Sequence, residues 1–439
     1  MKNNRFFFIF AFLLTLSSLS FPGRAQDTLR LMSFNIWQEG TSVTNGLEKI
    51  RDVIIAVDPD VVCFAEVRNY NGQDWTTKIL DALAVEGHSY NGKFYGGDVS
   101  LISKFPILSG TVVYNGTGSV VNYRLQTDHT DLLVGCAHLD YTYYACYLPR
   151  GYNGGDPNWN MIDDGTGNPA PVTDVNTILS YNLRGTRDEQ IAAFLDAVKD
   201  DTIPVFLMGD FNEPSWRDWT EKTDTMFDHH GTIIPWQNTK TLSDNGFTDA
   251  FREFFPDEVS NPGITWPSFA TGKGSTSWTP KADERDRIDY IFYKGQQIGV
   301  ADAALVGPRV SYAYNVVDTS YTSHEHFLAE DLPWPSDHKA VYAEITIGDN
   351  TSGIRPANNS AFCSVSPNPA GESLHISLDH RHNRVSVEIY TLGGKKIFGK
   401  TFAGTRSATI SVSGIHKGLH LVRIRAGGKS EVVKTMIGQ

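Results

Sequence analysis

The chain of 439 residues has only four cysteines, and no two of them form a Cys-x-x-Cys motif. A dense disulfide framework and thiolate zinc sites are therefore not indicated. The sequence also has no His-Glu-x-x-His motif and no Walker-type phosphate loop. Cys63 and Cys136 stand in apolar runs, where we expect them to be buried as small hydrophobic residues. Two disulfides stay open as alternatives, Cys136 with Cys146 or Cys146 with Cys363.

The N-terminal apolar run, residues 6–19, is shorter than the roughly 20 residues that a membrane-spanning helix needs. Lys2 and Arg5 precede it, and a short segment of small residues ending at Ala25 follows. This arrangement predicts a secretory signal peptide of residues 1–25, cleaved after its last residue. The alternative is an N-terminal membrane anchor. No cysteine follows the run, so a lipid anchor is not indicated.

Basic residues are scarce outside the C-terminal part of the chain. From Cys363 onward there are 11 Lys and Arg against 4 Asp and Glu, a balance of +7. Because the whole chain carries −12, the preceding residues carry −19. Affinity for nucleic-acid backbones comes chiefly from Lys and Arg. A nucleic-acid substrate is therefore disfavoured, although a bound metal ion can offset the charge locally.

Length and composition allow two domains, because a chain of 439 residues exceeds the size at which one core stops growing. In the first domain, short apolar runs alternate with amphipathic helical stretches, which predicts an α/β fold layered around a β core. We expect strands at residues 29–36, 61–66, 99–102, 132–138, 205–209, 288–293 and 339–347, and helices at 46–57 and 187–198. Two polar stretches without periodicity, residues 141–186 and 213–248, are interpreted as insertions.

The pattern changes after residue 347. Residues 348–361 are rich in Asp, Asn, Ser, Thr, Gly and Pro and predict a linker. Beyond it only short strands are expected, at residues 374–378, 385–390, 396–400, 408–412, 419–425 and 431–436, which is typical of a small all-β sandwich. The expected domains are residues 26–347, which carry the chemistry, and residues 362–439, which do not.

Several predicted strands begin or end at amide, carboxylate or imidazole side chains. These residues are Asn35, Glu66, His138, Asp210 with Asn212, and Asp337 with His338. Each one alone is better explained as a turn residue or a strand-end cap. So many of them in one domain indicate a functional site.

These residue types fit phosphate-ester hydrolysis with a hard divalent cation. Mg²⁺ prefers carboxylate oxygens and shares its ligand sphere with water and substrate phosphate. Glu66 is therefore the expected metal ligand, with Asn35 and Asp337 as oxygen neighbours, and Mn²⁺ or Ca²⁺ can use the same oxygens. Attack on phosphorus also needs a base for the water and donors for the developing charge, for which Asp210 and Asn212 are the candidates.

Two histidines complete the candidate chemistry. His138 and His338 can stabilise the phosphoryl oxygens or protonate the leaving group, and the sequence does not divide these roles between them. Asp289, within the segment Arg287-Ile288-Asp289-Tyr290, can hold one histidine in the required tautomer.

The same residues lie in an ordered series of motifs between residues 29 and 347. The motifs are Ser33-Phe34-Asn35, Ala65-Glu66-Val67, Ser100-Leu101-Ile102-Ser103-Lys104, His138-Leu139, Gly209-Asp210-Phe211-Asn212, Arg287-Ile288-Asp289-Tyr290 and Ser336-Asp337-His338. The series resembles the endonuclease/exonuclease/phosphatase superfamily, which includes deoxyribonucleases, abasic-site endonucleases, bacterial sphingomyelinases and inositol-polyphosphate 5-phosphatases. The resemblance implies a four-layered α/β sandwich with the site at one end of two packed sheets.

The resemblance also implies a role for each residue of the site. Asn35 and Glu66 would belong to the metal site, and Asp210 and Asn212 would act on the water and the transition state. His138 would contact the phosphate. Asp337 would support the metal or His338, and Asp289 would orient His338.

The insertion at residues 141–186 departs from the compact nucleases of that superfamily. Its aromatic residues are Tyr141, Tyr143, Tyr144, Tyr147, Tyr152 and Trp159. They can stack on a sugar or surround a cationic head group. The alternative is that they pack the insertion against its own domain.

The C-terminal part has a resemblance of its own. It rests on Ser364-Val365-Ser366-Pro367-Asn368-Pro369, Val387-Glu388-Ile389-Tyr390-Thr391-Leu392-Gly393-Gly394 and Gly418-Leu419-His420-Leu421-Val422-Arg423-Ile424. These segments resemble the C-terminal sorting domain of the type IX secretion system. The resemblance implies a Bacteroidota-type host, passage through the periplasm and export across the outer membrane. The alternative, a carbohydrate-binding sandwich, is disfavoured because this part has few aromatic residues.

The sequence thus predicts a secreted or cell-surface, monomeric phosphodiesterase or phosphomonoesterase that depends on Mg²⁺ and needs no organic cofactor. Its expected partners are a phosphate ester with a sugar, inositol or lipid head group, and the type IX secretion machinery. One alternative is an extracellular nuclease that degrades DNA or RNA. Another is a catalytically silent binding protein on the same scaffold, which is disfavoured because every expected position of the site is filled.

Overall fold

The structure is a computed structural model that describes residues 27–438, except 128–129, 156–158, 320–322, 349–362, 368–369, 392–394 and 427–428. The predicted signal peptide, and the predicted linker from residue 349 onward, lie outside the described residues. No helix among the described residues is long and apolar enough to cross a membrane.

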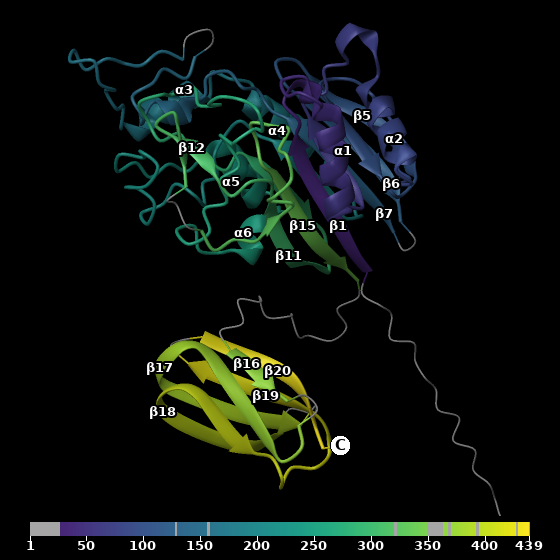
Figure 1. Cartoon of the computed structure of the whole chain (residues 1–439), viewed down its shortest axis with the longest axis vertical. Coiled ribbons are helices and arrows are strands. Elements are labelled where there is room, and N and C mark those ends of the chain that lie inside the picture. The colour runs from purple at the N-terminus through teal and green to yellow at the C-terminus, as the bar shows by residue number, and fades with distance from the viewer. Residues whose placement is uncertain are drawn as a thin grey trace, which may run out of the picture.

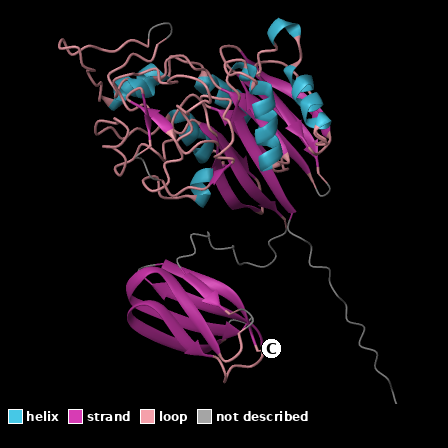
Figure 2. Ribbon diagram, in the orientation of Figure 1, coloured by secondary structure: helices cyan, strands magenta, loops and turns pink. Residues whose placement is uncertain are grey.

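The N-terminal part of the chain is built on two β-sheets (Figures 1 and 2). The first has seven strands in the order β14-β11-β15-β1-β2-β4-β3, and the second has six in the order β5-β6-β7-β8-β10-β9. The first consists of β1 (Asp27–Asn35), β2 (Val61–Ala65), β3 (Asn91–Gly92), β4 (Val99–Ser103), β11 (Ile298–Val306), β14 (Phe327–Leu328) and β15 (Ala340–Ile347). The second consists of β5 (Ile107–Asn115), β6 (Ser119–Gln126), β7 (Asp131–His138), β8 (Val205–Asp210), β9 (Thr248–Asp249) and β10 (Asp289–Lys294).

The two sheets pack face to face through one apolar core. Alternate residues of each strand point inward, so Leu31 and Val61 of the first sheet meet Val134 and Met208 of the second in one buried cluster. Such a core contributes roughly 25 cal/mol for each Å² of apolar surface that it removes from water.

Helices cover the outer face of each sheet (Figure 1). α1 (Gly46–Val57) and α2 (Trp75–Val85) pack on the first sheet, and α4 (Arg187–Val198) and α5 (Gln237–Asp244) pack on the second. In α1 the buried residues Ile50, Val53 and Ile54 follow the three- and four-residue spacing of one helix face. The layer order is therefore helix, sheet, sheet, helix, and the predicted four-layered α/β sandwich is confirmed.

A disulfide joins the two sheets at the centre of this core. Cys63 of β2 and Cys136 of β7 are bonded, with their Cα atoms 5.5 Å apart. The expectation that both are unbonded hydrophobic residues was wrong, because inward-pointing positions of facing strands come within bonding distance across the sandwich. The two alternative pairings, Cys136 with Cys146 and Cys146 with Cys363, were also wrong, and Cys146 is a buried thiol.

The two insertions pack against each other. Tyr144, Tyr147 and Tyr152 of the first insertion are buried in one cluster with Trp219 and Trp236 of the second. The packing interpretation is therefore confirmed for these three tyrosines. The remaining elements of the N-terminal part are short: η1 (Gln38–Gly40), η2 (Tyr70–Gly72), η3 (Ala145–Tyr147), α3 (Val175–Asn182), α6 (Ala250–Phe254), β12 (Ser311–Ala313) and β13 (Val316–Asp318).

The C-terminal part is an antiparallel β sandwich with its own apolar core. Its strands are β16 (Cys363–Ser366), β17 (Ser373–Thr391), β18 (Lys396–Ser411), β19 (Gly418–Ala426) and β20 (Lys429–Ile437). β17 and β18 are each one long strand where two short strands were predicted. The polar residues interpreted as turns lie instead at a register shift between Ser377 and His382, where the ladder bends without ending.

Candidate active site

The candidate site lies at one edge of the sandwich, where strands of both sheets end. β1 runs parallel to β2, which places Asn35 beside Ala65, and β7 runs parallel to β8, which places His138 beside Asp210. β10 runs antiparallel to β8 and begins with Asp289 opposite Asp210. The strand register alone therefore brings Asp210 between His138 and Asp289.

Gly209 makes this close register possible. A Cβ atom at Gly209 would lie 1.8 Å from the carbonyl oxygen of Ala137, far inside van der Waals contact. The residue also has φ +155°, a region that residues with a Cβ rarely adopt. Only glycine therefore lets β8 approach β7 at the step before Asp210.

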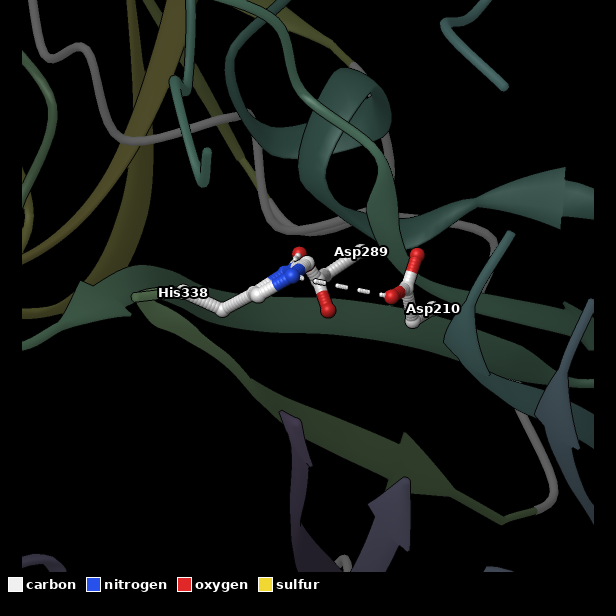
Figure 3. Close-up of side chains that lie close together, drawn as sticks. All are labelled: Asp210, Asp289 and His338. Atoms are coloured by element: carbon white, nitrogen blue, oxygen red, sulfur yellow. Dashed lines mark hydrogen bonds and ion pairs between the residues drawn. The ribbon is translucent and has the colours of Figure 1, made fainter. Parts of the chain in front are cut away.

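Asp210 accepts hydrogen bonds from two other residues of the candidate site. Its Oδ2 accepts a hydrogen bond from Asn35 Nδ2 at 2.9 Å, and its Oδ1 accepts one from the backbone N–H of Asn212 at 2.9 Å. Asp210, Asp289 and His338 each offer a ligand atom within 4.8 Å of the other two, so they form a compact buried group that can hold a metal ion. Figure 3 shows these three side chains pointing toward one another.

His338 is held between two carboxylates. Its Nδ1 lies 2.9 Å from Asp289 Oδ2, and its Nε2 lies 3.7 Å from Asp210 Oδ2. Burial disfavours a charge on the imidazole, but Asp289 and then Asp210 outweigh it and raise the pKa of His338 to about 10. The two carboxylates therefore favour the imidazolium form of His338, whose Nε2 faces Asp210 Oδ2.

His138 repeats this arrangement with another acid. Its Nδ1 lies 2.6 Å from Asp98 Oδ2, and its Nε2 lies 3.8 Å from Asp210 Oδ2. Burial again disfavours the charge, but Asp98 and then Asp210 raise the pKa of His138 to about 9. Two histidines with raised pKa values therefore face one carboxylate.

The remaining acids leave the site with excess negative charge. Asn35 Nδ2 donates to Glu66 Oε1 at 3.3 Å, and the buried Asp337 Oδ1 has no hydrogen-bond partner among the described residues. Burial raises the pKa of Asp337 to about 7, and the nearby Glu66 charge acts in the same direction. Two adjacent carboxylates with an unused buried oxygen fit the oxygen ligands that a hard divalent cation requires.

All eight predicted site residues lie in this region of the structure. Asn212 has the least direct interaction with the other site residues, because its Nδ2 donates one N–H to the carbonyl of Leu139 at 3.0 Å. The second N–H of the same amide is left for a substrate. Ser336 ties the region together, since its Oγ donates to the carbonyl of Asn35 at 2.7 Å and accepts from the backbone of His338 at 3.1 Å.

Three residues of the site were not predicted. Asp98 backs His138, and Arg68 forms ion pairs with Asp98 at 2.8 Å and with Glu66 at 3.5 Å. Trp266 lies beside His338, with ring centroids 6.4 Å apart. Asp98 directly precedes a predicted strand, as Asp337 and His338 do, so the same positional rule could have found it. Arg68 and Trp266 do not stand at the start or end of a predicted strand, so this rule could not have found them.

Comparison with known proteins decides the family. Residues 32–338 match the endonuclease/exonuclease/phosphatase family, and residues 364–438 match the secretion system C-terminal sorting domain. The chain belongs to the endonuclease/exonuclease/phosphatase family. An uncharacterized protein of Caenorhabditis elegans is 31% identical over 349 residues, which cover 77% of this chain and 98% of the relative.

The chain is also similar to solved structures of other proteins. A truncated Caenorhabditis elegans TDP2 is 16% identical, covering 73% of this chain and 97% of that chain with a TM-score of 0.40. A family member from Bacteroides thetaiotaomicron is 13% identical, covering 75% of this chain and 99% of that chain, also with a TM-score of 0.40.

Family membership settles the enzyme class. The protein is a metal-dependent phosphoric ester hydrolase, and it carries a C-terminal sorting domain of the type IX secretion system. This domain directs export to the cell surface or the extracellular space.

Proposed function

We propose that this enzyme hydrolyses a phosphodiester or phosphomonoester outside the cell, by attack of a water molecule that Asp210 deprotonates. The observation that supports this most strongly is the pair of histidines, His138 and His338, that both direct Nε2 at Asp210 Oδ2. A phosphate bound there meets a carboxylate base and two cationic donors at once.

Each proton in the reaction then has an assigned group. The water oxygen forms a bond to phosphorus, and its proton passes to Asp210. The bond from phosphorus to the ester oxygen breaks, and one histidine donates its Nε2 proton to that oxygen. The other histidine donates a hydrogen bond to a non-bridging oxygen, where negative charge builds in the transition state.

The carboxylates behind the histidines hold the two rings in the reactive orientation. Asp98 and Asp289 each accept from Nδ1, which leaves Nε2–H as the group that faces the substrate. Because Asp289 and His338 are engaged with each other, we assign the divalent cation to Glu66, Asp337 and Asn35 instead. When bound there, Mg²⁺ or a similar cation would neutralise phosphate charge and help the leaving oxygen depart.

Nucleic acid is the disfavoured substrate class, because the residues before Cys363 carry −19. We favour a small ester with a sugar, inositol or lipid head group.

A substrate panel tests the proposal. Plasmid DNA, RNA, sphingomyelin, inositol phosphates and bis(4-nitrophenyl) phosphate are assayed with Mg²⁺ and with a chelator, using the wild type and Asp210→Asn. We expect hydrolysis that is lost on chelation and reduced by about 10³-fold or more in Asp210→Asn, given the usual contribution of a catalytic base. Hydrolysis that survives both changes would contradict the mechanism. Cleavage of DNA or RNA alone would establish the nuclease alternative.

The proposed domain limits have a separate test. We propose that export begins with removal of residues 1–25, that residues 26–347 carry the activity, and that residues 362–439 serve sorting. Mass spectrometry of the secreted protein should then show a mature N-terminus at Gln26. A mature chain that retains Met1 would contradict the first of these limits.

A further inference from the structure

A row of aromatic rings runs from His338 to the protein surface. The Trp266 centroid lies 6.4 Å from that of His338, Trp278 lies 5.8 Å from Trp266, and Trp159 lies 4.9 Å from Trp278. Exposure rises from 5% for Trp266 to 45% for Trp278, and Trp159 is half-buried. Trp278 therefore leaves an apolar face in water next to two other tryptophans, and a ring that stacks on this face can remove it from water.

The inner end of the row is fixed to the candidate active site. The backbone N–H of Lys339 donates to the carbonyl of Thr265 at 2.8 Å, and that of Ser268 donates to the carbonyl of Asp337 at 2.6 Å. The segment that carries Trp266 is therefore bound on both sides to the segment that carries His338. A group seated on the row has a defined position relative to the reacting phosphate.

The outer end of the row is fixed by a buried acid. The backbone N–H of Trp278 donates to Glu284 Oε1 at 2.8 Å, and Tyr147 donates to Glu284 Oε2 at 2.7 Å. Glu284 is fully buried. Because the backbone of Trp278 is already ordered, a ligand that stacks on it loses less entropy on binding than one that must order a loop.

We propose that Trp266, Trp278 and Trp159 form a subsite for a ring in one ester group of the substrate, and that Trp278 provides its stacking face. The ring is uncharged and presents a flat apolar side, as a sugar or an aromatic ring does. The assignment rests on the proposed function, because it takes the phosphate to be bound at Asp210 and the two histidines.

The surrounding charges favour an uncharged ring over a cationic head group. Two acids contact the row, Glu284 at Trp278 and Asp286 at Trp266. The side-chain oxygens of Glu284 accept from Tyr147, Trp278 and Thr279, and those of Asp286 accept from Arg150 and Trp219. The nearby Lys281 is a cation whose Nζ binds the carbonyl of Gly167. A quaternary ammonium group would meet aromatic faces there, but the carboxylates of these two acids are already engaged with protein donors.

Direct binding measurements test this subsite without requiring turnover. The full-length chain with Mg²⁺ is titrated by calorimetry with methyl phosphate, phenyl phosphate, glucose 1-phosphate and phosphocholine, and release of inorganic phosphate is followed in parallel. We expect a ring-bearing ester to bind about tenfold more tightly than methyl phosphate, which corresponds to about 1.4 kcal/mol. If phenyl phosphate binds more tightly than glucose 1-phosphate, the subsite takes an aromatic ring. If glucose 1-phosphate binds more tightly, the subsite takes a sugar.

The variants decide whether Trp278 is responsible. Trp278→Ala should remove the tenfold preference and leave the Kd of methyl phosphate unchanged, whereas Trp278→Phe should keep most of the preference. Tyr314→Ala is the matched control, because Tyr314 is 51% exposed and lies outside the row. Equal affinity for all four esters, an equal loss for all four in Trp278→Ala, or tightest binding of phosphocholine would overturn the proposal.

The two proposals fail in different ways. If ring preference depends on Trp278 but no ester of any class is hydrolysed, the subsite stands and the proposed function fails. If hydrolysis depends on Asp210 but esters with and without a ring bind equally tightly, the proposed function stands and the subsite fails.

Discussion

His138 and His338 direct the same ring nitrogen, Nε2, at the same oxygen, Asp210 Oδ2, at 3.8 and 3.7 Å. His138 ends β7 in one sheet, and His338 precedes β15 in the other. Each has a carboxylate behind Nδ1. Each His–Asp pair therefore joins the two sheets, because Asp98 directly precedes β4 of the first sheet and Asp289 begins β10 of the second.

The His138–Asp98 pair predicts the alkaline limit of activity. His138 must be protonated to donate, and its pKa of about 9 means that it stays protonated below that value and loses its proton as the pH rises through it. Asp98→Asn removes the strongest charge that raises this pKa, so the alkaline limb of kcat should move to lower pH. Activity at pH 8 should fall by about tenfold or more.

The measurement is a pH–rate profile from pH 5 to 10 at saturating Mg²⁺. Asp131→Asn is the control, because Asp131 pairs with Arg124 at the surface. An alkaline limb that stays in place in Asp98→Asn would show that protonated His138 does not limit the rate.

The dependence of activity on Mg²⁺ distinguishes two candidate sets of metal ligands. One set is Glu66, Asp337 and Asn35, and the other is Asp210, Asp289 and His338. Glu66→Gln and Asp337→Asn should each raise the half-saturating Mg²⁺ concentration by about 10-fold or more, because each removes a charged oxygen ligand from a site that has few. The measurement is a Mg²⁺ titration of activity, with calorimetric titration of the chelated protein alongside. If both variants keep wild-type Mg²⁺ affinity and Asp289→Asn loses it, the cation is held by Asp210, Asp289 and His338 instead.

The disulfide should contribute measurably to stability. Replacing Cys63 and Cys136 together by alanine opens a covalent loop with a sequence separation of 73 residues. The chain-entropy relation gives a loss of about 4 kcal/mol for a loop of that size. Urea denaturation measures the loss, and Cys146→Ala is the control because it removes a buried sulfur without a crosslink. Equal losses in the two variants would mean that the crosslink contributes nothing.

Gly209 should be irreplaceable for steric reasons. Gly209→Ala places Cβ 1.8 Å from a backbone oxygen that cannot move without separating β7 from β8. We expect a loss of at least about 3 kcal/mol, which is characteristic of overpacking against backbone. Gly231→Ala is the matched control, because Gly231 has φ +77° with no neighbour within 4 Å of the added Cβ. It should cost about 1 kcal/mol from strain alone. Thermal unfolding of both variants distinguishes steric overlap from strain.

Much of the architecture was predictable because its strands are buried on both faces. β2, β4 and β8 are wholly buried and appear in the sequence as continuous apolar runs. β5 was not predicted, because it is exposed or half-exposed along its length and has no apolar run to mark it. β11 was not predicted for a related reason, since only its second half is buried.

The site was predictable where its residues stand at strand ends and less so elsewhere. His138 and Asp210 end neighbouring strands whose register brings them together, and Asn35 ends a strand of the facing sheet. Arg68 reaches the site from a loop, and Trp266 reaches it through an isolated bridge to Asp286. No local pattern reveals such contacts, because they depend on how distant segments fold back onto the sheet edge. The same limit explains why the partner of Cys63 was missed.

The bond between Cys63 and Cys136 also bears on when the enzyme becomes complete. Disulfides form in oxidising compartments and are rare in the cytosol. During synthesis the two halves of the sandwich would be joined only by non-covalent contacts, and the covalent bond would follow after the chain has left the cytosol. Protein produced in a reducing bacterial cytosol should therefore lack this bond, and production in the periplasm or refolding with an oxidant should supply it.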